Sequence, residues 1–383
     1  MGVITKVFQL STICLSALVL QSHAQTDPSD TLSNFSDFHR SLSFAGLLQT
    51  RYVASLSHNV DVNGLNYDTS THTPVNNTFL VKRARLQVRA NVNDHFGAYF
   101  MMNFADFSSS NLSGKVLENA FVKYSLNKHF NIQAGQFRPF FGVEDIIPVD
   151  IIRTLDFSNQ YYAFGSNGWQ SFQIGVTILG TITGDNQIPL RYYAGVYNGN
   201  NKNQPTDNDN TKNLYARLDV DPVKDLTLGV NGGTGSMAGS GTGNAWGGSI
   251  TGKFNLSTEF KLLFSGEFKS GTNFTNYNNA SGPKSLDQYR MHGFYLFPIL
   301  RYEYKRPRVR AIELSTRYEY LDLSYRLNSN PRQTIIPNLS FIFADNFYAA
   351  LQMGVSIDLY KTNVPLTTAY DQSLAYVQLQ IRF

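Results

Sequence analysis

The residues most able to do chemistry in this sequence are basic side chains at alternating positions. Within Leu80–Val92, Arg83, Arg85 and Arg89 share the odd positions, whereas the even positions are mostly apolar. An arginine stays charged and offers several fixed donors, so a row of arginines can bind a phosphate-like anion or pass it along a channel. Basic residues in similar segments extend the row: Arg51, Lys123, Arg191, Arg217 and Arg317.

Such arginines could instead form ion pairs that brace a wall. No acidic residue shares the Leu80–Val92 segment with Arg83, Arg85 and Arg89, which favours anion binding there. Arg317 lies between Glu313 and Glu319 on one segment, which favours the bracing interpretation for that residue. Both interpretations require that the basic residues share one face of a strand.

Alternation with a period of two predicts strands along the whole chain, because successive strand side chains point to opposite faces. A helix would scatter the arginines of Leu80–Val92 around its circumference. Sixteen segments have this pattern: Leu42–Val53, Leu80–Val92, Phe96–Ala105, Val116–Leu126, Phe130–Phe137, Trp169–Leu179, Leu190–Asn198, Lys212–Val220, Leu226–Gly235, Ala245–Phe254, Phe260–Lys269, His292–Glu303, Val309–Asp322, Gln333–Phe343, Phe347–Tyr360 and Ser373–Phe383.

The links between these segments alternate between short and long. Asn93–His95, Asn127–His129, Pro222–Asp225, Lys305–Arg308 and Ala344–Asn346 are short, whereas Leu56–Thr78, Phe107–Lys115, Phe140–Gly168, Gly199–Thr211, Ser270–Met291 and Lys361–Gln372 are long. This alternation is typical of a closed antiparallel transmembrane β-barrel with short periplasmic turns and long extracellular loops. We therefore expect an all-β fold of about 16 strands.

The composition agrees with a membrane barrel. Only 16% of the 383 residues are charged, whereas 14% are aromatic, which excludes a disordered chain. Aromatic residues near predicted strand ends indicate girdles at the two membrane interfaces. They are Phe79, Tyr124, Phe130, Trp169, Tyr302, Tyr320, Phe347 and Tyr360.

The N-terminus predicts export. Lys6, an apolar stretch from Leu10 to Leu20 and the small residues Ser22 and Ala24 indicate a signal peptide over residues 1–24. Residues 25–40 are then a periplasmic segment and residues 41–383 the barrel. Cys14 would leave with the signal peptide, so no disulfide or thiol chemistry is expected. The remaining 31 basic and 28 acidic residues give no basis for a nucleic-acid partner.

The longest link, residues 140–168, is too apolar for an exposed loop, and we interpret it as a constriction loop inside the barrel. A folded external cap and a contact with a neighbouring subunit are the alternatives. Its charged residues are mostly acidic and would oppose the arginines if the loop enters the lumen: Glu144, Asp145, Asp150 and Asp156, against Arg153 alone.

Several segments resemble the phosphate- and polyphosphate-selective porins of the Gram-negative outer membrane. The resemblance lies in Val81–Val88, Ala120–Tyr124, Gly135–Phe140, Gly195–Gly199, Ala216–Leu218 and Glu313–Tyr318. It implies a sixteen-stranded barrel, usually a homotrimer, that lies among outer-membrane lipids and passes small anions. The barrel assembly machinery is then an expected partner. The acidic constriction segment departs from the family, whose members often carry basic residues there.

Two other functions compete with that of a porin. An enzyme is disfavoured by the sequence, whereas a non-selective or non-conducting barrel remains an alternative. An enzyme needs a base within reach of a nucleophile, yet the histidines are scattered and form no Ser-His cluster or metal-ligand spacing. We therefore predict no catalytic residue, no metal and no cofactor. A non-selective barrel, or a non-conducting one that acts as a receptor or structural subunit, stays open, and conductance in planar bilayers separates it from a porin.

The C-terminus generates a prediction about assembly. Ala375, Val377, Leu379, Ile381 and Phe383 alternate along the last segment, and a terminal Phe resembles the assembly signal of bacterial outer-membrane barrels. Phe383→Ser should therefore lower the yield of folded protein in the outer membrane without altering its synthesis. Immunoblots of total and outer-membrane fractions measure both quantities. Equal membrane yields of the variant and the unchanged protein would contradict the assignment.

Overall fold

The computed structural model describes residues 40–105, 116–148, 152–204, 206–207, 209–282, 285–344 and 347–383. The predicted signal peptide lies outside these residues, as does Asp150. Of the predicted periplasmic segment, only Arg40 is described. Both N-terminal assignments therefore stay predictions.

The described chain is built almost entirely of strands. They are β1 (Ser41–Ser55), β2 (Asn77–Asn91), β3 (Phe96–Asn103), β4 (Leu117–Ser125), β5 (Asn131–Phe137), β6 (Gln173–Thr181), β7 (Leu190–Tyr197), β8 (Asn213–Val223), β9 (Leu226–Gly235), β10 (Gly243–Asn255), β11 (Phe260–Thr272), β12 (Arg290–Tyr302), β13 (Ala311–Asp322), β14 (Arg332–Ala344), β15 (Ala349–Tyr360) and β16 (Gln372–Arg382). Most predicted boundaries agree within three residues, whereas β6 begins four residues after the predicted Trp169.

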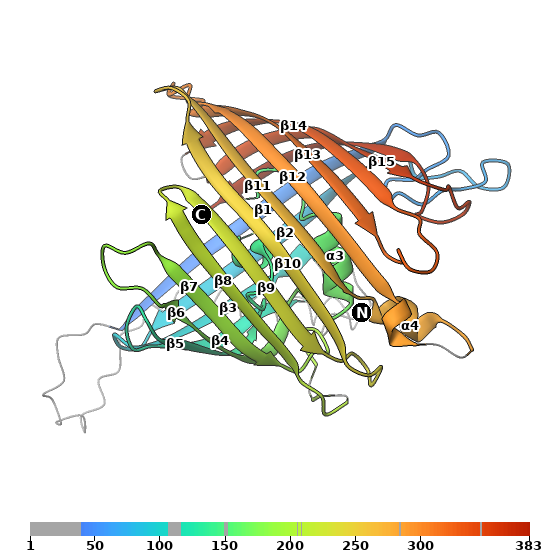
Figure 1. The fold of residues 1–383 in the computed structure, drawn as a ribbon. Coiled ribbons are helices and arrows are strands. Elements are labelled where there is room, and N and C mark those ends of the chain that lie inside the picture. The colour runs from blue at the N-terminus through green and yellow to red at the C-terminus, as the bar shows by residue number, and fades with distance from the viewer. Residues whose placement is uncertain are drawn as a thin grey trace, which may run out of the picture. The chain divides into compact units, whose positions relative to one another are not determined.

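These strands form one closed antiparallel barrel in which each strand pairs with its neighbours in sequence (Figure 1). The ring closes between β1 and β16, in a register that runs from Leu47 opposite Arg382 to Ser55 opposite Leu374. Closure leaves no strand edge unpaired, which a lipid environment requires because it offers no hydrogen-bond partners to the backbone. The predicted fold class is confirmed.

Short turns with similar chemistry join several strands at one end of the barrel. The side-chain oxygens of Asn93 and Asn127 each accept hydrogen bonds from the two backbone N–H groups that follow at positions +2 and +3. Ser257 repeats the arrangement with Glu259 and Phe260. A side chain that satisfies its own turn in this way stabilises a tight reversal. The long links lie at the other end.

The outer wall of the barrel is apolar, as a lipid-facing surface must be. Val230, Leu296 and Leu314 are each more than half exposed, although they lie in the middle of their strands. Two predicted girdle residues are elsewhere, because their rings are buried on the inner side: Trp169 precedes β6 and packs in an internal cluster, and Phe347 packs against Ala311, Ile342 and Ala350. Their assignment to the girdle was wrong.

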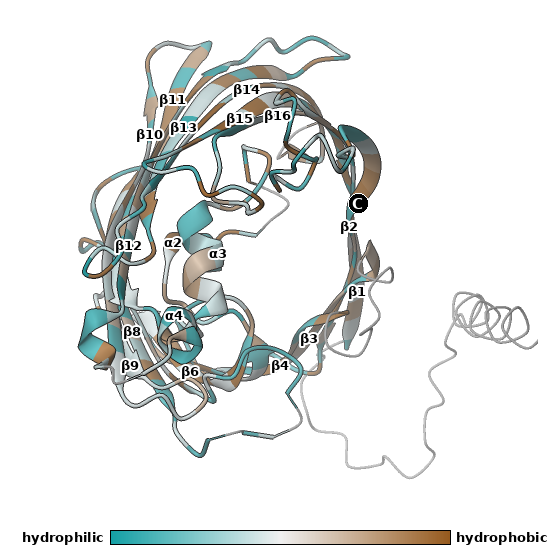
Figure 2. Cartoon of the chain, turned by 90° about the vertical axis from the view of Figure 1, so that its right-hand side faces the viewer, coloured by the Kyte–Doolittle hydropathy of each residue, from teal (hydrophilic) through white to brown (hydrophobic). Residues whose placement is uncertain are grey.

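The link between β5 and β6 folds inside the ring of strands (Figure 2). It contains α2 (Val143–Ile146) and α3 (Asn159–Ser166). Its aromatic residues join inward-facing residues of the wall in one apolar cluster: Phe137, Phe141, Phe164, Trp169, Tyr197, Tyr215, Ala245, Phe274 and Met291. Burial of this apolar surface holds the link against the wall. A second link contains α4 (Phe274–Asn279) and the 3-10 helix η3 (Leu286–Gln288).

No helix among the described residues is both long and apolar enough to cross a membrane.

The two ends of the barrel should differ in accessibility on intact cells. Ser70 lies exposed in the long link between β1 and β2, and Lys305 lies exposed in the turn between β12 and β13 at the opposite end. An epitope tag inserted after Ser70 should bind antibody on intact cells, whereas one after Lys305 should bind only after the outer membrane is permeabilised. Labelling of the Lys305 tag on intact cells would reverse the orientation.

Candidate functional site

A β-bulge in β2 makes an additional cation point into the interior of the barrel. In the β1–β2 ladder Gln49 lies opposite Arg83 and Thr50 lies opposite Val81, so Lys82 is the extra residue. Bulges of this kind change which face the following side chains occupy. As a result Lys82 and Arg83 both point inward. Lys82 is one of the even positions of Leu80–Val92, which the strand pattern assigns to the apolar face. That assignment is wrong for Lys82, because alternation alone does not detect an extra residue.

A second bulge does the same for an acid. Met101 lies opposite Asn119 and Met102 lies opposite Leu117, so Glu118 of β4 is the extra residue. Glu118 pairs with Arg85 of β2, with 2.8 Å between Arg85 Nη2 and Glu118 Oε1. Both side chains are almost fully buried. The absence of an acid from the segment of Arg85 therefore did not leave this arginine free.

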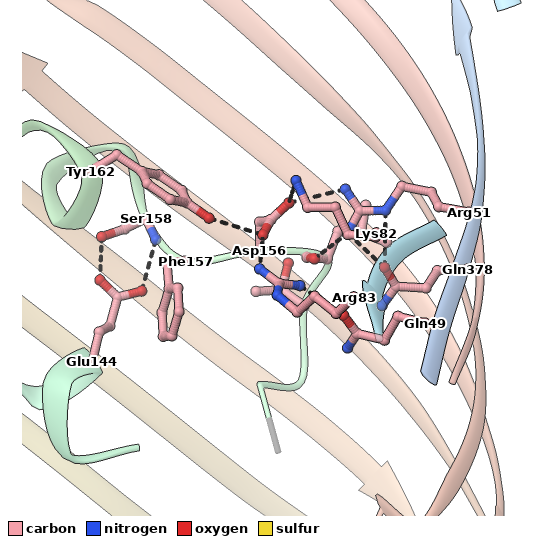
Figure 3. Close-up of polar contacts among 12 residues, drawn as sticks. Gln49, Arg51, Lys82, Arg83, Glu144, Asp156, Phe157, Ser158, Tyr162 and Gln378 are labelled. Atoms are coloured by element: carbon pink, nitrogen blue, oxygen red, sulfur yellow. Dashed lines mark hydrogen bonds and ion pairs between the residues drawn. The ribbon is translucent and has the colours of Figure 1, made fainter. Parts of the chain in front are cut away.

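Three cations of β1 and β2 converge on one carboxylate of the internal link (Figure 3). Asp156 Oδ2 lies 2.9 Å from Arg51 Nη1 and 3.1 Å from Lys82 Nζ. Asp156 Oδ1 lies 2.5 Å from Arg83 Nη2 and accepts a hydrogen bond of 3.0 Å from the Tyr162 hydroxyl. Three positive charges against one negative charge leave this group with an excess of two positive charges.

Amide side chains of the wall hold the two arginines in place. Arg51 Nε donates to Gln378 Oε1 at 2.9 Å, and Arg83 Nη1 donates to Gln49 Oε1 at 2.7 Å. Burial alone would raise the pKa of Asp156, but Arg83, Arg51 and Lys82 hold it well below its usual value. Asp156 is therefore ionised at any physiological pH. We call Arg51, Lys82, Arg83 and Asp156 the charge cluster.

The charge cluster borders a cavity of about 330 Å³ between the internal link and the wall. Two further arginines reach this cavity, and each pairs with an acid of the wall. Arg317 Nη2 lies 2.6 Å from Glu319 Oε1, and Arg332 Nη2 lies 2.8 Å from Asp358 Oδ2. The excess positive charge on the lining of the cavity consequently comes from Arg51 and Lys82, which share Asp156, and Arg83 adds a further positive charge beside them. Lys82 is the most accessible of the three, with 34% of its side chain exposed.

The remaining basic residues of the predicted row lie in different surroundings. Arg191 pairs with Asp221, and Arg217 pairs with Asp219. Arg89 lies over the ring of Tyr99, 5.2 Å from its centroid. Within the described part of the chain, neither Arg89 nor Lys123 takes part in an ion pair. The structure thus brings together only some of the predicted residues.

The acids of the internal link do not act together. Glu144 and Asp145 are buried against the wall, where Glu144 accepts hydrogen bonds from the backbone N–H and hydroxyl of Ser158. Asp145 accepts a hydrogen bond of 2.7 Å from Gln170. Arg153 pairs with Glu313. Of the described acids of the predicted constriction segment, only Asp156 belongs to the charge cluster.

The described residues contain no group of three or more His, Cys, Asp or Glu side chains arranged to hold a metal ion. The chemistry that the cavity can perform is electrostatic. Its arginine and lysine groups can bind anions and keep them partly desolvated between the link and the wall.

Comparison with known proteins identifies the family. A family model described as phosphate-selective porin O and P matches residues 55–261, just over half of the chain. The chain belongs to this family. It is a porin of the bacterial outer membrane. No curated protein sequence matches the porin.

Solved structures show the same fold at low sequence identity. A loop L8 deletion mutant of OmpT, an outer membrane protein of Vibrio cholerae, is 11% identical with a TM-score of 0.57, over 90% of this chain and 99% of that one. The anion-selective porin from Comamonas acidovorans is 12% identical with a TM-score of 0.56, over 90% and 100% of the two chains. The outer membrane channel DcaP of Acinetobacter baumannii is 14% identical with a TM-score of 0.55, over 91% and 99%.

Sequence reasoning missed Lys82, Tyr162 and Glu118 as members of the porin's interior. One signal was available for Lys82: in a strand that otherwise alternates strictly, a cation directly before Arg83 would face lipid unless the ladder contained a bulge. Glu118 gave the same signal, because strict alternation would put it with Ala120 and Val122 on the lipid side. Tyr162 gave none, because its role depends on where α3 packs.

Glu144→Gln should remove a pH dependence of the docked link. Burial raises the pKa of Glu144 from 4.5 to about 7, despite the nearby Arg317 and Lys269. A carboxyl with a raised pKa stabilises docking fully below pH 4.5, and this stabilisation is lost as the pH rises through 7. The loss is roughly 3 kcal/mol at most.

Open-channel current noise in planar bilayers, recorded from about pH 5 to pH 8, measures how firmly the link is docked. We expect noise that grows with pH in the unchanged porin and stays flat in Glu144→Gln. Asp185→Asn is the control, because Asp185 lies exposed on a turn with Lys128. If the current noise of Glu144→Gln rises with pH as much as that of the unchanged porin, the pH dependence belongs to another group.

Proposed function

We propose that this porin mediates passive diffusion of small hydrophilic solutes with a preference for anions such as phosphate or polyphosphate. The charge cluster is its selectivity element. The observation that carries the proposal is the convergence of Arg51, Lys82 and Arg83 on a single carboxylate inside the barrel. Fixed positive charge in a partly desolvated channel raises the local concentration of anions and lowers that of cations.

The link between β5 and β6 is the constriction of the pore in this proposal. Its position inside the ring of strands and its contacts with opposite parts of the wall support this role. Leu47 of β1 packs with Phe157 and Tyr161, whereas Phe141 and Phe164 belong to the cluster against the far wall. A segment fixed on both sides narrows the path, so that permeating ions pass close to the charge cluster.

The proposal extends to catalysis, oligomeric state and membrane insertion. The porin acts without catalysis, assembles as a homotrimer and is inserted by the barrel assembly machinery. The anion-selective porin from Comamonas acidovorans, which shares the fold, supports the preference for anions. The alternative of a receptor or structural barrel predicts no conductance in planar bilayers.

Lys82→Gln should weaken anion preference in dilute salt. The substitution removes one positive charge, yet Arg51 and Arg83 still hold Asp156. Electrostatic attraction to Lys82 weakens beyond the Debye length, about 8 Å at physiological salt and about 3 Å at 1 M. The reversal potential under a gradient of dilute potassium chloride should therefore move toward zero, and much less so near 1 M.

Lys128→Gln is the matched control, because Lys128 also pairs with an aspartate but lies on an exposed turn. Its reversal potential should equal that of the unchanged porin. An unchanged reversal potential for Lys82→Gln in dilute salt would mean that the charge cluster braces the wall and does not select ions.

A further inference from the structure

Asp156 presents to the three cations of the charge cluster the same group that a carboxylate solute would present. Its two oxygens receive four donors: Arg51 and Lys82 on Oδ2, Arg83 and Tyr162 on Oδ1 (Figure 3). Two oxygens with two donors each match the acceptor capacity of an ionised carboxylate. The donors come from both the wall and α3, so they surround the carboxylate from opposite sides.

We infer that the side chain of Asp156 is a tethered competitor, which occupies the solute site when no solute is bound. We further infer that the solutes of this site are small organic carboxylates. Both inferences rest on the proposed function. A permeating carboxylate displaces the side chain of Asp156 and takes its place between Arg51, Lys82 and Arg83. When the solute leaves, Asp156 returns. The exchange keeps the arginines paired at every stage.

The backbone around Asp156 allows this exchange without movement of the whole link. Arg317 Nη1 donates to the Asp156 carbonyl at 2.7 Å, and Arg51 Nη2 donates to the Leu155 carbonyl at 2.5 Å. The next residues are fixed by the Glu144–Ser158 hydrogen bonds and by the Asn159 backbone N–H, which donates to Glu319 at 2.6 Å. The carboxylate can therefore leave by rotation about its side-chain bonds.

Charge and space favour a solute over an empty site. Once Asp156 has turned away, Arg51 and Lys82 face the cavity of about 330 Å³ without their carboxylate, Arg83 loses the same partner beside them, and buried charges without partners are costly. Lys82, the accessible member, is the first group that an arriving anion meets. A tethered group has an effective concentration in the millimolar range or above, so Asp156 weakens the apparent affinity for solutes and keeps their release fast.

Asp156→Asn tests the inference, with acetate and succinate as probes. Each probe is added to planar bilayers that contain the full-length porin in dilute potassium chloride, and its apparent Kd is taken from the block of single-channel current. If Asp156 leaves the site free for about a tenth of the time, its removal should make both carboxylates bind about tenfold more tightly. Asp156→Ala, which removes the carboxylate altogether, should show the same gain.

Asp358→Asn is the matched control. Asp358 lies in the same cavity and neutralises Arg332, but it belongs to β15 and does not contact the charge cluster. General loss of negative charge would tighten carboxylate binding equally in Asp156→Asn and Asp358→Asn, which would overturn the inference. A tethered competitor predicts a clearly larger gain in the two Asp156 variants than in Asp358→Asn, which only adds the field of an unpaired Arg332.

Three further outcomes each bear on a different part of the inference or of the proposed function. Unchanged carboxylate affinity in both Asp156 variants, with anion preference retained, would reject the competitor and leave the anion porin standing. Loss of anion preference in Asp156→Asn would contradict the proposed function itself, because this variant gains positive charge. Inorganic phosphate that blocks Asp156→Asn at lower concentration than either carboxylate would reject carboxylates as the solute class.

Discussion

Backbone pairing in lipid is the constraint on which the rest of this structure depends. A spanning strand that leaves its N–H and C=O groups without partners is several kcal/mol less stable for each group, so the sheet must close on itself. Closure between β1 and β16 meets this requirement, and it also assigns every residue of every strand to one of two faces. A charged side chain that falls on the outer face must then be moved, and a bulge moves it by one residue.

The bulges at Lys82 and Glu118 are local answers to this constraint. Each brings a charge inward at the position where the chain would otherwise expose it to lipid. Each inward charge meets a partner of the opposite sign: Lys82 meets Asp156 and Glu118 meets Arg85. The two bulges therefore keep charge off the outer face and also form ion pairs in the interior.

The alternation of apolar and polar residues was enough to predict the strands, their number and the closed ring, because a period of two is a property of the local sequence. The bulges escaped prediction because they exist only as a mismatch between two paired strands, and one strand alone does not show its register. The partners of Arg51 and Arg83 escaped for a related reason. Asp156 lies in a segment without strand periodicity, and only the packing of Phe157 and Tyr161 against Leu47 brings it to β1.

The same ion pairs that stabilise the interior limit how strongly it can select ions. A wall with only arginines on its inner face would repel itself, and buried cations without partners would destabilise the barrel by several kcal/mol each. Arg217 with Asp219 and Arg317 with Glu319 are compensated within their own strands, and they contribute little net field. Selectivity then depends on the few places where compensation is incomplete. In the charge cluster the compensating acid belongs to a link and not to the wall. An acid on the wall cancels a cation permanently, whereas an acid on a link, which can leave by rotation about its side-chain bonds, cancels it only until a solute with the same group displaces it.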